Sequence, residues 1–312
     1  MSALILALQM TLAAVSLPGT SAQTPSKTTR EQADRLIQRI VGMLKSDDVA
    51  IQERAEKEIR RLSERDRSAL LAVSSHEYWE REFAWSLLTR AGDRRVIPYL
   101  RQAVDPGDAK ETLRLRAVEY LGKLNDAGSV GTFIRLARSG DDVAGAALRA
   151  LGQIDDERAR QALLECLEQP ELPWHDKEDA MEAIGRQRDP RGVPAIIKIG
   201  SVHAPHDPPA FETKEYTDWV KAMSLKSVAA VALARIGTRE SVEAAVRLIP
   251  EIEFRQSRDD TTRTVVNELS ALEKRTKDPQ FRDRLRALIS QITPSAQREM
   301  SGAGPADPAG RR

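Results

Sequence analysis

Histidine and carboxylate side chains are the residues of this chain whose spacing could hold a metal ion. Two of the four histidines stand in the run His203-Ala-Pro-His206-Asp207, and His175-Asp176 lies in the link before the preceding helix. Zinc binds imidazole nitrogens and carboxylates when three or four of them meet in fixed geometry. His175, His203 and His206 are therefore the candidates for a metal site, although a proline-rich run with two histidines is more typical of a surface loop. We expect no bound cofactor.

Other catalytic signatures are missing from the sequence. There is no phosphate-binding glycine loop, no His-Glu-x-x-His motif and no Gly-x-Ser-x-Gly motif. Cys166 is the only cysteine; it lies among leucines, without a histidine nearby, and we interpret it as a small buried apolar residue. Paired acids such as Asp155-Asp156 fall in short turns, where capping of backbone N–H groups explains them better than acid–base catalysis. No catalytic residue is predicted, and we expect the protein not to be an enzyme.

An internal repeat organises most of the chain. An alanine stands four residues before a leucine or isoleucine six times, at Ala55/Ile59, Ala84/Leu88, Ala117/Leu121, Ala147/Leu151, Ala180/Ile184 and Ala232/Ile236. The second members, at 59, 88, 121, 151, 184 and 236, are separated by steps of 29, 33, 30, 33 and 52 residues. A period near 30 residues indicates an array of repeats, in which each unit buries its apolar face against its neighbours.

Each repeat is predicted to be two helices joined by a turn. The alanine and the residue four positions later lie on one helix face, and alanine at the same place favours a close approach between helices. A glycine directly follows in four copies and is expected to end the helix in the left-handed conformation, at Gly122, Gly152, Gly185 and Gly237. An acidic residue five positions on is expected to cap the second helix, at Glu64, Asp93, Asp126, Asp156 and Asp189.

Two of these copies carry a family resemblance. The segments Ala147–Asp156 and Ala117–Asp126 resemble HEAT repeats, and in particular the short HEAT-like repeats named after phycobiliprotein lyases, over about residues 35–292. The resemblance implies an all-α fold, a right-handed α-solenoid of six to seven helix pairs with the alanine-bearing helices on its concave side. The family includes scaffolds, adaptors, lyases and a metal hydroxylase. The hydroxylase repeats a His-Glu pair that occurs only once here, at His76-Glu77, so that activity is not expected.

The two ends of the chain differ from the repeats. Residues 1–17 are nearly all apolar and are followed by small residues, which predicts a signal peptide over 1–22 and cleavage before Gln23. The first ten residues lack the usual basic residue, and an uncleaved membrane tether is the alternative to export into the periplasm or the medium. We expect a linker over 23–33, the solenoid over 34–292, and a disordered tail over 293–312. A loop over 201–219, which contains three prolines, would account for the 52-residue step.

Charge limits the choice of partner. The net charge is only +1, so a nucleic acid is not expected to bind. Residues 138–189 contain 13 acidic and 7 basic side chains, a net charge of −6. A solvated surface explains such a segment, but it would also favour a basic partner.

The predicted function is that of an exported scaffold or adaptor that binds a protein or peptide on the concave face. The alternative is a ligand-binding or metal-binding, enzyme-like site under the 201–219 loop, with a lyase-like or metal-dependent activity. A second alternative is nucleic-acid binding. No oligomeric state is predicted. The expected partner-binding residues are exposed aromatic or arginine side chains on the alanine-bearing helices and in the loop: Trp79, Phe83, Arg54, Arg116, Phe211, Tyr216 and Trp219.

Overall fold

The described part of the chain is all-α. The computed structural model describes residues 26–74, 79–105, 111–202, 208–252 and 255–300, and these contain helices, turns and links but no strand. The predicted signal peptide therefore lies outside the described residues. The chain forms two compact units, residues 1–99 and 100–312, which are described separately below.

The amino-terminal unit packs four helices around one core. They are α1 (Lys27–Leu44), α2 (Val49–Arg60), α3 (Glu64–Val73) and α4 (Trp79–Arg90), followed by the 3₁₀ turn η1 (Arg94–Val96). Helix α1 packs against the other three and buries an apolar stripe that includes Ile37 and Ile40. The predicted linker is wrong from residue 27 onward. Ser26 caps α1 by accepting the N–H of Thr29 at 3.2 Å, and Ala33 is fully buried.

The carboxyl-terminal unit is built from two rows of helices. Helix α5 (Ile97–Val104) spans the boundary between the units. The first helices of the following pairs are α6 (Glu111–Lys123), α8 (Ala144–Leu151), α10 (Trp174–Gln187), α12 (Lys214–Ile236) and α14 (Arg255–Arg275). The second helices are α7 (Val130–Ala137), α9 (Glu157–Leu167), α11 (Val193–Gly200), α13 (Arg239–Leu248) and α15 (Pro279–Met300). Short 3₁₀ turns stand at η2 (Ala127–Ser129), η3 (Pro190–Gly192) and η4 (Ile249–Glu251).

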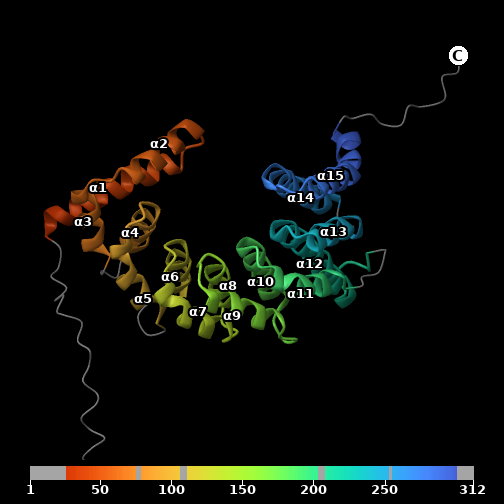
Figure 1. The fold of residues 1–312 in the computed structure, drawn as a ribbon. Helices are drawn as coiled ribbons and strands as arrows, with labels where there is room; N and C mark the ends of the chain where they lie inside the picture. Colours follow the sequence, from red (N-terminus) through yellow and green to blue (C-terminus); the bar gives the residue numbers. More distant parts are fainter. Residues whose placement is uncertain (1–25, 75–78, 106–110, 203–207, 253–254, 301–312) are drawn as a thin grey trace, which may run out of the picture. The chain divides into compact units, whose positions relative to one another are not determined.

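The first helices of this unit pack side by side in chain order, and we call them the first-helix layer. Second helices pack beside this layer, as α13 packs against α12 and α15 against α14 (Figure 1). The order of the helices confirms the predicted helix pairs. Both residues of each of the six Ala/Leu or Ala/Ile repeats are buried, as expected for their packing face. With α14 and α15 the described residues hold seven pairs. The handedness and the concave position of the first helices stay predictions.

The repeated glycines have a different role from the one predicted. Gly122 and Gly185 lie inside their helices, and Gly152, at the end of α8, has φ −65°, so none of the three is left-handed. The left-handed residues at two of these turns are Asn125 (φ 51°) and Arg188 (φ 55°). Only Gly237 (φ 76°) ends its helix as predicted.

The three other glycines allow neighbouring first helices to approach closely. A Cβ atom on Gly122 would lie 2.9 Å from Cα of Ala150, and one on Gly185 would lie 2.8 Å from Cα of Ala232. Distances this short are well inside van der Waals contact, so any side chain there would push the helices apart. The recurring glycine therefore sets the spacing of the layer.

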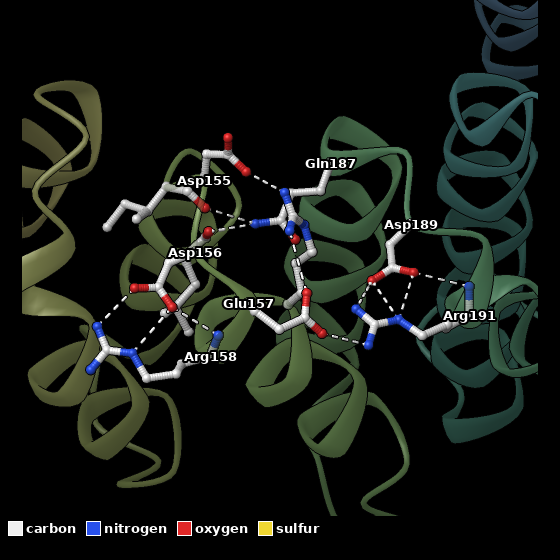
Figure 2. A network of polar contacts seen from close by, with 10 residues as sticks. Asp155, Asp156, Glu157, Arg158, Gln187, Asp189 and Arg191 are labelled. Carbon is white, nitrogen blue, oxygen red and sulfur yellow. Dashed lines mark hydrogen bonds and ion pairs between the residues drawn. The ribbon is translucent and has the colours of Figure 1, made fainter.

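Aspartates in the turns accept hydrogen bonds from the arginine two positions later in the sequence. The Asp189 carboxylate accepts the backbone N–H of Arg191 at 3.0 Å and also its guanidinium, with Oδ2 2.6 Å from Nη2 (Figure 2). The same arginine reaches back to Glu157 of the preceding pair at 2.7 Å. Asp156 and Arg158 repeat this geometry, with the backbone N–H donated at 2.8 Å. These contacts cap the second helices and also tie consecutive pairs together.

The turn at Asp126 binds an arginine from another helix and has, among the described residues, no cap hydrogen bond to its aspartate. Gly128 stands where the turns of Asp93, Asp156 and Asp189 have arginine, and Arg101 from the preceding second helix supplies the guanidinium instead. Its Nε and Nη2 lie 2.9 and 2.7 Å from the Asp126 carboxylate. A Cβ on Gly128 would stand 3.0 Å from Arg101 Cζ and closer still to its Nη2, so the glycine leaves room for the imported arginine.

The predicted loop and tail are both shorter than expected. Helix α12 begins at Lys214, capped by the Thr213 hydroxyl, which accepts the N–H of Tyr216 at 3.1 Å. The prolines end at residue 209, so nothing beyond Thr213 prevents a helix. Much of the 52-residue step thus becomes helix, and α12 has 23 residues. At the other end α15 continues past Pro294 to Met300, so the predicted tail is wrong over 293–300.

Candidate binding groove

A groove lies on the first-helix layer of the carboxyl-terminal unit, over α10, α12 and α14. Its volume is about 290 Å³. The lining residues are mostly small, hydroxylated or charged: Glu182, Ser227, Val228, Val231, Ala232, Arg235, Asp260, Thr261 and Thr264. This size is close to the lower end of sites that hold drug-sized ligands, roughly 300–1,000 Å³. It suits one or two aliphatic side chains of a partner.

Helix α12 provides the apolar floor. Val228 and Val231 are three residues apart, lie on one helix face and are half-buried, while Ala232 beside them is buried. On α14 the facing residues Thr261 and Thr264 are short, so no long side chain covers the valines. The groove therefore results from small side chains at positions where a surface helix usually carries long polar ones.

Polar contacts join the three helices around this floor. The Ser227 and Ser257 hydroxyls lie 3.1 Å apart and connect α12 to α14. Arg235 contacts Glu268 of α14 at 3.2 Å and Glu182 of α10 at 3.5 Å. One guanidinium is thus shared between two carboxylates, and the groove has acidic rims on both sides.

The acidic character continues toward the amino end of α10. Burial raises the pKa of Asp176, Glu178 and Asp179, in the last case although Arg149 donates to its Oδ2 at 2.6 Å. The Ser224 hydroxyl of α12 donates to Glu178. These carboxylates have lost hydration without gaining an equal number of cations.

The amino-terminal unit has a separate cavity of about 770 Å³ and opposite character. Basic residues outnumber acidic ones by four to two in its lining, which consists of Leu44, Val49, Gln52, Glu53, Glu56, Lys57, Arg60, Arg61 and Arg90. Arg90 is already engaged by Glu56 at 2.6 Å. Val49 is exposed at its edge.

The predicted aromatic residues of the 201–219 segment do meet. Phe211 is 74% exposed and packs edge-to-face on Tyr216, with ring centroids 5.2 Å apart. Tyr216 in turn lies 5.9 Å from Trp219, which is only 4% exposed and packs with Ala222 and Met223. Trp219 is therefore a core residue that supports the other two rings, so its expected direct contact with a partner does not fit its burial.

The remaining predicted residues are spread over both units. Arg54 is exposed on α2, and Phe83 is half-buried on α4. Arg116 is exposed on α6 and contacts Glu119 at 3.0 Å. Trp79 begins α4, but its side chain lies outside the described residues. Of the predicted partner-binding residues, the structure therefore brings together only Phe211, Tyr216 and Trp219, which we call the aromatic trio.

The metal-site residues are not brought together in the described part of the chain. His175 is exposed on α10, with its ring next to that of Trp174, and His203 and His206 lie outside the described residues. Among the residues that are described, no group of three or more potential ligands is close enough to bind a metal ion. Cys166 is buried as predicted, and burial raises the pKa of its thiol.

None of the helices in the described ranges is both long and apolar enough to cross a membrane.

The helix pairs of both units define an all-α helical-repeat protein. Residues 97–185 match the family model of HEAT repeats, in agreement with the resemblance seen in the sequence. No curated protein matches the chain.

Three solved structures have a similar arrangement at low identity. A chain of the complex of CpcE and CpcF of phycocyanin lyase from Nostoc sp. PCC7120 is 19% identical, with 82% of this chain and 94% of that chain covered, at a TM-score of 0.45. Human deoxyhypusine hydroxylase in complex with glycerol is 13% identical over 78% of this chain and 98% of its own, with a TM-score of 0.29. A computationally designed self-assembling cyclic homooligomer is 16% identical over 88% and 92%, with a TM-score of 0.17.

The groove residues themselves were not predicted from the sequence. A signal exists, because Ser224, Ser227, Val228 and Val231 recur at spacings of three and four on the face of α12 opposite its buried residues. Such a run of short side chains on an outward face is unusual for a solvated helix.

Proposed function

We propose that this chain is a scaffold or adaptor that binds a protein or peptide partner on the first-helix layer of its carboxyl-terminal unit. The observation that carries the proposal is the groove over α10, α12 and α14, whose valine floor is left uncovered by its neighbours. Half-buried Val228 and Val231 contribute less to the fold than buried residues do, because part of their apolar surface still contacts water. A partner side chain would remove that surface from water.

A non-catalytic role suits the chemistry of the described residues. The carboxylates of the turns are occupied by arginines, and the one thiol is buried. A ligand-binding or metal-binding site near residues 201–219 remains a hypothesis that depends on His203 and His206, outside the described residues. Metal content of the purified protein, with and without His203→Ala, tests it directly.

We also propose that the protein is exported and that residues 1–22 are removed. The apolar run over 1–17 and the small residues before Gln23 support this proposal. Intact-mass measurement of the protein from its native envelope tests it. A mature chain that begins at Gln23 is the expected result, whereas an intact chain in the membrane fraction would favour the tether.

Binding is tested by crosslinking in the source cells, with the full chain carrying a carboxyl-terminal affinity tag. A partner should be enriched with the natural chain and lost with Val231→Asp, which places a charge on the groove floor. Val202→Asp is the matched control, because Val202 is 47% exposed and does not line the groove. Equal enrichment by both variants would contradict the proposed surface, and helical circular dichroism would verify that each variant is folded.

A further inference from the structure

We infer that the α10/α12/α14 groove accepts a partner segment in which a lysine or arginine stands close to a branched aliphatic residue. This inference rests on the proposed function and names the chemistry of its partner. Its two parts, an apolar floor and an acidic rim, come from different residues and can be tested separately.

The floor selects the aliphatic residue. A volume of about 290 Å³ over Val228 and Val231 matches a valine, leucine or isoleucine side chain with part of the adjoining backbone. The hydroxyls of Ser227 and Thr264 stand at the sides of the floor, where they can pair with backbone groups of an extended segment. A bulky aromatic ring would not be enclosed by walls this short.

The rim selects the basic residue. Two carboxylates, those of Glu182 and Asp260, line the groove together with one guanidinium, that of Arg235. Two further carboxylates stand on the same helices: Glu268 contacts Arg235, and Glu178 accepts the Ser224 hydroxyl. Arg235 contacts Glu182 and Glu268, while Glu178 receives only the Ser224 hydroxyl among the described residues. The imbalance favours an incoming cation.

Two outer arginines do not remove this imbalance. Arg186 contacts Glu182 at 2.9 Å and Arg263 contacts Asp260 at 3.1 Å, each from the same helix as its carboxylate. Their side chains are 40% and 67% exposed. Exposed pairs of this kind are individually weak, so a partner's cation can replace either arginine at little cost.

The neighbouring part of α10 extends the acidic rim. Asp176 and Asp179 both point toward Gly145 of α8, where a Cβ would lie 3.4 Å from Asp176 Oδ1 and nearer still to Asp179. Arg149 Nη1 lies 3.4 Å from the same Cβ position and 2.6 Å from Asp179 Oδ2, so this end of the rim already holds a cation.

The test uses arrays of short synthetic peptides and the full-length protein. Every peptide carries one valine or leucine, and the position of a lysine or arginine relative to it is varied; a matched set has glutamate instead. We expect the basic set to bind and the glutamate set not to bind. Asp260→Asn should weaken the best peptide about three- to tenfold, as expected for loss of one rim charge, and added salt should weaken it further.

Two variants separate floor from rim. Thr264→Trp fills the groove without changing charge and should abolish binding of the basic peptides. Asp283→Asn is the control for Asp260→Asn, because it removes a similarly exposed carboxylate with an arginine three residues away but on α15. This control should leave the affinity unchanged.

Failure of the inference is distinguishable from failure of the proposed function. Equal binding of basic and acidic peptides, or no effect of Asp260→Asn, would overturn the inference. No bound peptide at all would also overturn it, and if Val231→Asp still abolished capture of a partner in cells, the proposed function would stand without it. If no peptide bound and Val231→Asp did not affect capture of a partner, the inference and the proposed function would both be overturned.

Discussion

Gly152 at the end of α8 lies so close to Ala183 of α10 that a Cβ on the glycine would stand 2.5 Å from the alanine Cβ. Both residues are in right-handed helical conformation or next to it, so the requirement for glycine is one of space. The same relationship links Gly122 to Ala150. Small residues on facing helices thus fix the distance between consecutive repeats.

Enlarging Gly152 should therefore destabilise the protein. Gly152→Ala is expected to lower the free energy of unfolding by about 1–3 kcal/mol, because overpacking forces the helices apart. Urea unfolding followed by circular dichroism measures it. Gly131→Ala on α7 is the control, since no atom lies within 4 Å of its added Cβ, and it should be neutral or slightly stabilising. Equal effects of both changes would refute the spacing role.

The contact of Arg101 with Asp126 allows a test by a compensating substitution. Arg101→Leu removes the guanidinium from a carboxylate that is 3% exposed, and should cost about 1–3 kcal/mol of unfolding free energy. Adding Gly128→Arg to that variant restores the Asp-x-Arg pattern of the other turns and should recover a large part of the loss. Gly128→Arg alone should destabilise, because Arg101 occupies its space. A double-mutant cycle measures the coupling, and simple additivity would contradict the interpretation.

The turn carboxylates predict a defined response to acid. Hydrogen bonds from Arg191 and Arg95 hold the pKa of Asp189 and of Asp93 below the ordinary value of about 3.9. A lowered pKa means that the stabilisation is complete above the unfolded value and is lost as the pH falls through the folded one.

Asp189→Asn should therefore reduce the loss of stability below about pH 4, while it lowers stability near neutrality. Urea midpoints measured across this range give the slope directly. Burial shifts the pKa of Glu178 and Asp179 upward, and these groups act in the opposite direction, because they favour the folded state as they become protonated. A variant whose acid slope equals that of the natural chain would show that Asp189 does not carry the effect.

The aromatic trio separates a binding role from a structural one. Phe211→Ala should change the free energy of unfolding by less than about 0.5 kcal/mol, because the ring is largely exposed. Trp219→Ala should cost about 3–5 kcal/mol through the cavity it leaves. Thermal unfolding of both variants tests this pair of expectations. If Phe211→Ala weakens partner capture while the fold is intact, Phe211 belongs to the binding surface.

The sequence predicted what depends on periodicity. The Ala/Leu and Ala/Ile pairs follow from spacing along a helix, and the burial of Cys166 follows from the leucines around it; both expectations are confirmed. The glycines were misinterpreted because one sequence position serves two purposes, a left-handed cap at Gly237 and a close contact at Gly152. Only the neighbouring helix decides which applies.

The groove depends on which helices become neighbours, and a single sequence does not contain that information in readable form. Glu182, Val231 and Asp260 come from three helices that the sequence predicts one by one, without fixing which faces meet. The sequence also shows an insertion near residue 201 but not that its second part is helical, since the prolines dominate the pattern there.

The cluster of Trp219, Ala222 and Met223 has a dynamic consequence. It is a small core at the amino end of α12, whereas the carboxyl end of the same helix, around Leu233, belongs to the stacked repeats. The first turns of α12 can therefore open without unfolding of the whole array, and their amide hydrogens should exchange with solvent faster than those near Leu233. A partner that covers Phe211 would slow exchange in these turns first. Hydrogen–deuterium exchange would therefore detect binding even if the backbone did not move.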